Sequence, residues 1–289
     1  MSFAERLQAY LKAENLPAAF AEAVVAVYAP LAERIADAAR RHGPGFVVGL
    51  CGSQGSGKST LVGVLEMLLD EAGLRTATLS LDDFYLPRVD RTALAATVHP
   101  LLATRGVPGT HDAPLMASVI DRLRAGEGAL VPRFDKAADT RAPDRREIAG
   151  PVEVILFEGW CVGARPEPAA ALEAPLNALE RERDPDGVWR TYVNDQLAGP
   201  YRALFERLDR LVLLQAPSFE VVLGWRTEQE HKLKARLARE GRDLARAMSD
   251  AEIAAFIAHY ERITRHILAE MPARADEVVQ LGEDRRPVS

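Results

Sequence analysis

Apolar and polar positions alternate along the chain in blocks that predict strands and helices in turn. Short apolar runs bounded by polar residues or glycine are typical of buried strands, and helical periodicity separates most of these runs. This alternation predicts an α/β fold in which a central parallel sheet is flanked by helices. The predicted strands lie at residues 46–51, 76–81, 152–157, 210–215 and 277–281. We expect residues 1–289 to form a single domain.

Both ends of the chain carry helical patterns. Residues 1–42 have apolar side chains at helical spacing, and we interpret them as an N-terminal helical appendage that packs on the domain and carries no chemistry. Near the other end, Ser249 and Glu252 have the spacing of a capping box, which predicts that a helix begins there. Its expected apolar face consists of Ile253, Phe256, Ile257, Tyr260, Ile263 and Ile267.

Two polar segments interrupt the alternation. Residues 82–150 are rich in Pro, Gly, Arg and Asp, with one helical pattern near residues 115–123. A segment of this length between two strands is more often functional than idle, so we expect an inserted substrate-binding segment that folds over the carboxyl edge of the sheet. Residues 165–190 combine prolines with many charges, and we expect them at the surface.

A glycine-rich motif follows the strand predicted at 46–51, and a helical pattern ending at Gly73 follows the motif. It fits G-x-x-x-x-G-K-S/T, the loop whose backbone N–H groups and helix N-terminus surround a phosphate. The motif residues are Gly52, Ser53, Gln54, Gly55, Ser56, Gly57, Lys58, Ser59 and Thr60. Lys58 would reach the β- and γ-phosphates, and Ser59 would ligate Mg²⁺. A glycine turn that binds nothing is the alternative, but the strand before and the helix after favour a P-loop NTPase fold.

Carboxylates follow two of the predicted strands at the edge where the glycine-rich loop also opens. Asp82 and Asp83 come after the second strand, and Glu158 comes directly after the third. A kinase needs a carboxylate that orients the acceptor hydroxyl and takes its proton, and one of the two aspartates would serve. Asp82 and Glu158 would also help to hold Mg²⁺, mostly through water. The alternative is that these residues only cap turns or form ion pairs.

Phosphoryl transfer also needs cations that converge on the γ-phosphate. Arg105 and Arg133 are candidates in the middle segment, as are Lys136 and Arg141. A second group follows the fourth strand, in residues 224–248, which we interpret as a helical lid. Its basic residues are Arg226, Lys232, Lys234, Arg236 and Arg239. Pairs at i,i+4, such as Glu228 with Lys232 and Glu230 with Lys234, would instead brace the helix, and Arg226 is the preferred catalytic candidate.

Composition narrows the possible classes of function. The net charge of −6 argues against a nucleic-acid partner, which would favour a basic surface. No apolar run approaches the ~20 residues that span a bilayer, and the first residues lack a signal-peptide core, so we expect no membrane partner and a cytoplasmic location. The two cysteines, Cys51 and Cys161, lack metal-ligand spacing, and Cys51 is interpreted as a small buried thiol. Nothing in the sequence indicates the oligomeric state.

Several motifs together resemble one known family, the D-glycerate 3-kinases of the plant and fungal type, over roughly residues 46–287. These motifs are the glycine-rich loop, Asp-Asp-Phe-Tyr, Arg-Gly-Val-Pro-Gly-Thr-His-Asp, Pro-Arg-Phe-Asp-Lys, Leu-Phe-Glu-Gly-Trp and Trp-Arg-Thr-Glu-Gln-Glu. The family is similar to uridine kinases, phosphoribulokinases and pantothenate kinases. The resemblance implies ATP- and Mg²⁺-dependent phosphorylation of the 3-hydroxyl of D-glycerate, which gives 3-phosphoglycerate and ADP.

The resemblance also implies roles for individual residues. Lys58 would bind the nucleotide and Ser59 the metal. Asp82 is a better match than Asp83 for the catalytic base, and Glu158 would lie near the metal. The residues in the blocks that shape the acceptor pocket are Tyr85, Arg105, His111, Asp112, Arg133 and Asp135.

Charge arguments leave the acceptor open, because glycerate, another small hydroxy acid and a sugar phosphate are all anions that an arginine would bind. A uridine, phosphoribulose or pantothenate kinase is therefore the alternative within the class. A regulatory ATP-binding protein without an acceptor is the alternative from another class, and it has no need of a hydroxyl-orienting Asp82.

Overall fold

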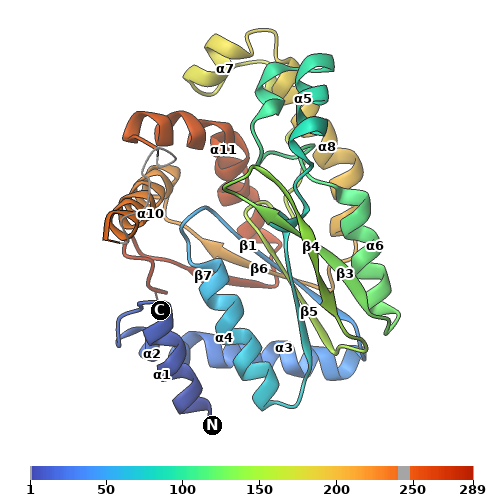
Figure 1. Ribbon diagram of the computed structural model, residues 1–289, viewed down its shortest axis with the longest axis vertical. Helices are drawn as coiled ribbons and strands as arrows, with labels where there is room; N and C mark the ends of the chain where they lie inside the picture. The colour runs from blue at the N-terminus through green and yellow to red at the C-terminus, as the bar shows by residue number, and fades with distance from the viewer. Residues whose placement is uncertain (1, 240–247, 289) are drawn as a thin grey trace.

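A five-stranded parallel sheet forms the centre of the fold, with strand order β2-β5-β1-β6-β7. The computed structural model describes residues 2–239 and 248–288. The sheet strands are β1 (Phe46–Gly52), β2 (Thr76–Ser80), β5 (Val154–Gly159), β6 (Arg210–Gln215) and β7 (Glu277–Gln280). Each coincides with a predicted strand to within two residues, which confirms the α/β fold with a central parallel sheet (Figure 1).

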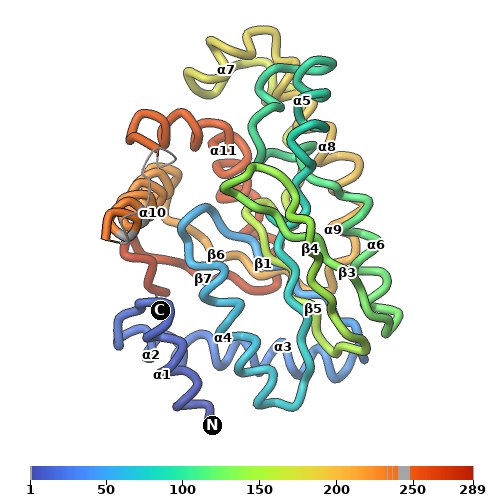
Figure 2. The backbone as a smooth tube through the Cα atoms, viewed as in Figure 1, coloured from blue at the N-terminus to red at the C-terminus, as the bar shows by residue number. Residues whose placement is uncertain are grey.

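Helices cover both faces of the sheet because successive side chains of the buried strands point to opposite sides. On β1, Val48 and Leu50 pack into one core and Val47 and Cys51 into the other. The first core includes residues from the N-terminal helices and α4, and the second includes residues from α6, α8 and α11 (Figures 1 and 2). The main helices are α1 (Phe3–Ala13), α2 (Phe20–Ala23), α3 (Ala29–His42), α4 (Lys58–Glu71), α5 (Arg88–Thr97), α6 (Ala113–Arg124), α7 (Ala178–Arg183), α8 (Val188–Gln196), α9 (Arg202–Phe205), α10 (Phe219–Arg239) and α11 (Asp250–Glu270).

Helix boundaries follow local signals in the sequence. Ser249 and Glu252 form the predicted capping box of α11, with the Glu252 N–H donating to Ser249 Oγ at 3.3 Å and the Ser249 N–H donating to Glu252 Oε2 at 2.7 Å. At the end of α4, Gly73 has φ of 74° and closes the helix, as glycine does without a Cβ clash. At the N-terminus, Leu31 and Ile35 of α3 are fully buried against the sheet, so residues 1–42 supply one of its covering layers.

The inserted segment contains an antiparallel hairpin that hydrophobic patterning did not predict. Its strands are β3 (Ala129–Asp135) and β4 (Thr140–Ile148), and β4 is polar and largely exposed except at Ile148. A strand without a buried face lacks the alternation by which strands are recognised. The hairpin contacts α6 and a 3-10 turn at Leu81–Phe84, which places its tip over the carboxyl edge of the sheet (Figure 2).

The expectation that residues 165–190 lie at the surface is wrong for several charged residues. Glu180, Asp184 and Arg190 are 1%, 1% and 4% exposed, respectively. Arg190 donates to Asp184 Oδ2 at 3.1 Å, and Arg262 of α11 donates to both oxygens of Glu180 at 2.7 Å. Each of these buried charges has an opposite partner, and the pair between Glu180 and Arg262 joins the segment to α11.

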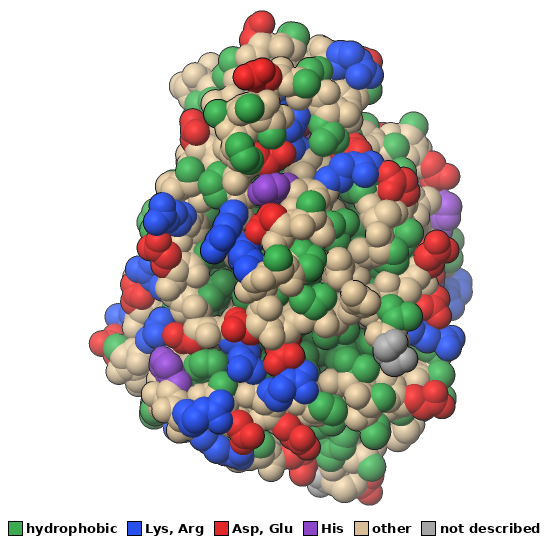
Figure 3. Space-filling model, turned by 180° about the vertical axis from the view of Figure 1, so that it is seen from behind, with side chains coloured by type: hydrophobic (Ala, Val, Ile, Leu, Met, Phe, Trp, Pro, Cys, Tyr) green, Lys and Arg blue, Asp and Glu red, His purple; other side chains and the backbone are tan. Residues whose placement is uncertain are grey.

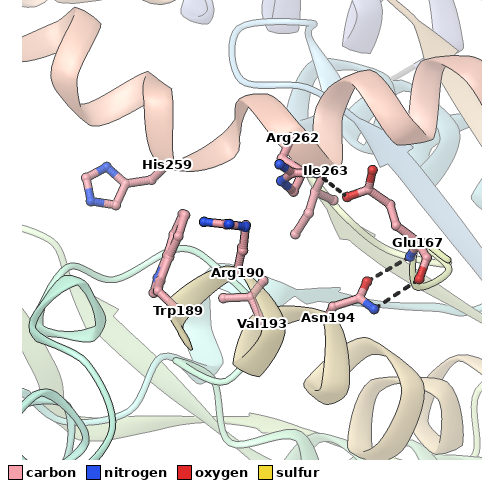
Figure 4. A pocket seen from close by; sticks show the side chains of 8 residues that line it. All are labelled: Glu167, Trp189, Arg190, Val193, Asn194, His259, Arg262 and Ile263. Atoms are coloured by element: carbon pink, nitrogen blue, oxygen red, sulfur yellow. Dashed lines mark hydrogen bonds and ion pairs between the residues drawn. The ribbon is translucent and has the colours of Figure 1, made fainter. Parts of the chain in front are cut away.

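A small cavity of about 10 Å³ lies within this ionic region, between α8 and α11 (Figure 4). The backbone of Glu167 exchanges two hydrogen bonds with the Asn194 amide, and its carboxylate accepts from Arg262 at 3.4 Å. A volume of this size holds about one water molecule, so the cavity belongs to the packing of the segment.

Charges are mixed over the outer surface. On the face opposite the view of Figure 1, basic and acidic side chains lie interspersed with apolar ones (Figure 3). Within the described residues, no helix has the length and apolarity needed to cross a bilayer. Of the predicted lid at 224–248, residues up to Arg239 belong to α10, whereas 240–247 and the side chain of Arg236 lie outside the described part of the structure.

We expect Arg262→Met to lower the free energy of unfolding by about 3–5 kcal/mol, because it leaves the buried Glu180 carboxylate without its partner. Adding Glu180→Met should recover part of that loss. The matched control is Arg202→Met, which removes an exposed i,i+4 pair with Glu206 and should change stability by less than about 1 kcal/mol. Urea unfolding followed by circular dichroism measures all three, and equal losses for Arg262 and Arg202 would contradict the buried-pair argument.

Candidate active site

The glycine-rich loop joins β1 to α4 in the geometry of a phosphate cradle. Gly57 has φ of 89°, and a Cβ on Gly52 would lie 2.8 Å from Ser56 Oγ and 3.1 Å from Lys58 Cγ, so a side chain at position 52 would crowd the loop. The first helical hydrogen bond of α4 runs from the Leu61 N–H to the Gly57 carbonyl. The preceding N–H groups therefore have no partner in the helix and can face an anion.

Polar atoms of this loop are buried without a partner. Ser53 Oγ, Gln54 Oε1 and Ser56 Oγ make no hydrogen bond to any described residue. Lys58 folds back over the loop, and its Nζ donates to the Ser53 carbonyl at 2.9 Å. Buried polar atoms normally have partners, so these orphaned groups fit a loop that is completed by a bound anion.

The register of the sheet brings the predicted carboxylates to this loop. Glu158 of β5 is the partner of Leu50 on β1 and of Ser80 on β2, so the three strand ends lie side by side. The Ser80 hydroxyl donates to Glu158 Oε1 at 2.6 Å. Burial raises the pKa of Glu158, and the nearby Lys58 ammonium acts in the opposite direction. Glu158 and Lys58 are therefore close enough to interact across the site.

Asp82 and Asp83 lie in the 3-10 turn after β2, and their environments differ. Asp82 accepts from Lys136 Nζ at 2.6 Å and from the Tyr85 hydroxyl at 2.9 Å. Burial disfavours the charged form of Asp82, but Lys136 and Tyr85 outweigh it, so its pKa lies below the usual value. For Asp83, burial raises the pKa, and the Phe134 N–H at 3.4 Å offsets this only in part. Asp82 is thus the carboxylate that its neighbours hold ionised.

An aromatic cluster forms the wall beside Asp82. Tyr85 stacks on His111 with ring centroids 4.4 Å apart and meets the edge of Phe134 at 5.1 Å. Arg105 lies over the Phe134 ring, with its guanidinium carbon 5.5 Å from the ring centroid, and pairs with Asp139. Burial lowers the pKa of His111 to about 3, so its imidazole is neutral near pH 7. The structure therefore brings Tyr85, Arg105 and His111 together around Asp82.

Other predicted acceptor-pocket residues make structural contacts. Asp112 caps α6 by accepting from the Leu115 N–H at 3.1 Å, and it also accepts from Arg141 at 3.0 Å. Asp135 accepts from two N–H groups in the hairpin turn. Arg133 is largely exposed and pairs with Asp144 across the hairpin at 2.5 Å, so it is not part of the aromatic cluster.

Arg226 pairs with Glu230 one turn later in α10, at 2.8 Å. Arg226 also acts electrostatically on Tyr260 of α11, as do Asp82 and Arg105, which places it at the periphery of the same cluster. One turn of α10 packs on the phosphate loop, since a Cβ on Gly55 would lie 2.9 Å from the Cβ of Trp225. The predicted brace between Glu228 and Lys232 is present at 2.5 Å.

The structure adds two tyrosines to this cluster and distinguishes Lys136 from the other candidate cations. Lys136 was one of several candidate cations, and only its contact with Asp82 distinguishes it. Tyr260 was interpreted solely as part of an apolar helix face, yet its hydroxyl donates to the Arg105 carbonyl at 3.1 Å. Tyr201 carried no signal in the sequence, and its hydroxyl lies 2.5 Å from His111 Nδ1. Contacts between residues so far apart in the chain leave no local sequence pattern from which they could be predicted.

The donor atoms near the loop fit a magnesium ion that is shared with a nucleotide. Ser59 lies exposed in the first turn of α4, and the carboxylates of Asp82 and Glu158 interact electrostatically with each other. Among residues 2–239 and 248–288, no group of three or more His, Cys, Asp or Glu is arranged to hold a metal. Mg²⁺ commonly takes one or two protein oxygens together with phosphates and waters, so Ser59, Asp82 and Glu158 are the residues that would hold it.

Cys51 and Cys161 are both buried as free thiols, as interpreted for Cys51 from the sequence. Burial raises the pKa of Cys51 to about 12, which keeps it protonated and unreactive. Trp160 is likewise buried, and its Nε1 donates to the Gly106 carbonyl at 2.8 Å. These residues support the site from within the core.

A parallel sheet, a phosphate loop at its carboxyl edge and an acidic turn at the same edge are the features of a P-loop kinase. Residues 19–85, which include the loop, match the family described as methylmalonyl-CoA mutase-associated GTPase MeaB. An uncharacterized kinase of Schizosaccharomyces pombe is 34% identical over 226 residues, covering 74% of this chain and 78% of that protein.

Two D-glycerate 3-kinases are similar over most of the chain. The chloroplastic enzyme of Arabidopsis thaliana is 31% identical over 265 residues, covering 85% of this chain and 54% of its own length. The solved structure from Cryptococcus neoformans aligns with a TM-score of 0.74 and 27% identity over 90% of this chain and 96% of that one. The chain belongs to the P-loop kinase family that includes these D-glycerate 3-kinases, with uridine and pantothenate kinases as more distant relatives.

The buried neutral His111 makes stability depend on pH. Its pKa of about 3 in the folded state lies below the ordinary value of 6.5, so between these values only the unfolded chain binds the proton. We expect the wild type to lose about 1 kcal/mol more per pH unit than His111→Gln as the pH falls from about 6 to 4. Urea unfolding at each pH measures the difference. The exposed His231→Gln is the matched control, and parallel curves for wild type and His111→Gln would refute the argument.

Proposed function

We propose that this protein transfers the γ-phosphoryl group of ATP to the 3-hydroxyl of D-glycerate. The carrying observation is the Asp82 carboxylate, which is held by Lys136 and Tyr85 and lies close enough to Glu158 for the two to interact, as Lys58 also does. A protein that only binds nucleotide needs no such carboxylate, whereas a kinase must orient an acceptor hydroxyl at this point. The similarity to two D-glycerate 3-kinases supports the choice of acceptor.

The loop at residues 52–60 would hold the triphosphate through its N–H groups and Lys58. Ser59, Asp82 and Glu158 would hold Mg²⁺, which would supply positive charge to the phosphates of the nucleotide. Arg226 at the start of α10 would add a cation from the side of the lid. Lys58 and Arg226 therefore balance the charge that develops during transfer.

In the proposed reaction the acceptor hydroxyl oxygen forms a bond to the γ-phosphorus while the bond to the bridging oxygen of ADP breaks. The hydroxyl proton passes to a carboxylate oxygen of Asp82, which is ionised and therefore able to accept it. Lys136 holds Asp82 in place and balances the negative charge near the transferred group. Asp83 accepts only from the Phe134 N–H at 3.4 Å and lacks the hydrogen bonds from Lys136 and Tyr85 that orient Asp82, so we assign the base role to Asp82.

The acceptor would lie between Asp82 and the aromatic cluster. Arg105 offers a cation for the carboxylate of a small hydroxy acid, and its pairing with Asp139 and contact with Phe134 fix its direction. Tyr85 and His111, which stack on each other beside Phe134, would form a wall of the site. We assign Asp112 and Asp135 to the support of this pocket, and Arg133 to the outer face of the hairpin.

Asp82→Asn should leave ATP affinity within a few fold of the wild type while it lowers acceptor-dependent ADP release by at least ~10², because the amide cannot take the proton. Asp83→Asn is the matched control and should have a much smaller effect. The assay measures ADP release with D-glycerate, L-glycerate, uridine, pantothenate and ribulose 5-phosphate. A strong response to another compound would identify that compound as the acceptor in place of D-glycerate. Equal ADP release with and without every acceptor would favour a nucleotide-dependent switch.

Lys136→Met should lower kcat for the acceptor by about 10-fold or more, because it removes the cation beside Asp82. Since Lys136 lowers the pKa of Asp82, its loss should also move the acid limb of the kcat/KM profile to higher pH. Lys136→Arg keeps the charge and should retain most of the activity and the wild-type profile. An unchanged acid limb in Lys136→Met would show that Asp82 is not the group whose ionisation controls the rate.

A further inference from the structure

Tyr201 and His111 form a buried pair whose hydrogen bonds determine where the imidazole proton lies. Tyr201 lies in the turn that follows α8 and is fully buried, and its hydroxyl lies 2.5 Å from His111 Nδ1. The same oxygen accepts from the Gly109 N–H at 3.2 Å, and among the described residues no acceptor other than His111 Nδ1 lies within hydrogen-bond distance of this hydroxyl. A buried hydroxyl proton needs an acceptor, and the bond from Gly109 uses a lone pair of the oxygen and not its proton.

The Tyr201 proton must therefore be the hydrogen of the bond to His111. Nδ1 is the acceptor of that bond, and the single proton of the neutral imidazole belongs on Nε2. The backbone holds the ring in place, because the Asp112 N–H donates to the Phe84 carbonyl at 2.8 Å and the Leu86 N–H to the Thr110 carbonyl at 2.9 Å. Stacking on Tyr85 fixes its plane.

The other ring nitrogen of His111, Nε2, has no hydrogen-bond partner among the described residues. His111 is only 5% exposed, and its Nε2 is buried and makes no hydrogen bond to a described residue. Buried N–H donors nearly always have a partner, and this one lies in the cluster that surrounds Asp82. An orphaned donor beside a reacting carboxylate points to an oxygen of the ligand.

We infer that Tyr201 is a positioning residue that locks His111 in its Nε2–H form, so that His111 donates a neutral hydrogen bond to an oxygen of the acceptor. This inference rests on the proposed kinase function and adds a specificity determinant to it. A neutral donor suits a hydroxyl or carboxylate oxygen next to Asp82, because it adds no charge that would compete with Lys136 for that carboxylate. Acceptors without an oxygen at this point would leave the donor unpaired and bind weakly.

The test combines ¹⁵N NMR of the histidine side chains with steady-state kinetics. His111 should show the Nε2–H pattern in the wild type. Tyr201→Phe should give a mixture of tautomers and raise KM for D-glycerate about 10-fold, with KM for ATP unchanged. The matched control is Tyr192→Phe, which alters a neighbouring tyrosine that contacts Gly109 and should change neither the tautomer nor KM.

An Nδ1–H pattern in the wild type would overturn the inference, as would an unchanged KM for D-glycerate in a Tyr201→Phe variant with mixed tautomers. If that variant does not fold, the wild type decides: D-glycerate with a non-hydrolysable ATP analogue should shift the Nε2–H resonance, and no shift refutes the contact. Failure of the proposed function is distinct, because the wild type would then phosphorylate no acceptor in the panel whatever the tautomer of His111.

Discussion

The alignment of the strand ends at one edge of the sheet is the constraint on which the site depends. All strands of the central sheet run parallel, so the residues that follow them emerge together. The pairing of Glu158 with Leu50 and with Ser80 sets the distance from the phosphate loop to the acidic turn at Asp82. A shift of one residue in this register would turn the carboxylate of Glu158 to the opposite face of the sheet. The hydrogen-bond ladder of the core therefore controls the chemistry at its edge.

Much of this arrangement could be predicted because its signals are local. The buried strands are continuous apolar runs, the capping box at Ser249 marks a helix start, and the loop at residues 52–60 has fixed spacing. The carboxylates at Asp82 and Glu158 could be located because they directly follow those strands. Sequence separation was short in each case, so one window contained the whole signal.

The features that escaped prediction depend on contacts between distant residues. Lys136 meets Asp82 across 54 positions, and Tyr201 meets His111 across 90. The hairpin strand β4 has few buried residues, and the buried Glu180 is paired by Arg262 of the distant helix α11. Arg133 differs in another way, since its motif favoured the pocket whereas the structure pairs its exposed side chain with Asp144 across the hairpin. Side-chain direction follows from the tertiary structure, which a short motif does not contain.

The close approach of α10 to the phosphate loop has a consequence for observing the protein. Gly55 has no room for a side chain because the backbone and Cβ of Trp225 lie against it, and the Trp225 indole is held by a bond from Nε1 to the Glu283 carbonyl at 2.6 Å. A rearrangement of the loop around a phosphate would therefore change the environment of the Trp225 side chain. An indole fixed beside the loop provides a native fluorophore, whose emission would follow nucleotide occupancy without an added label.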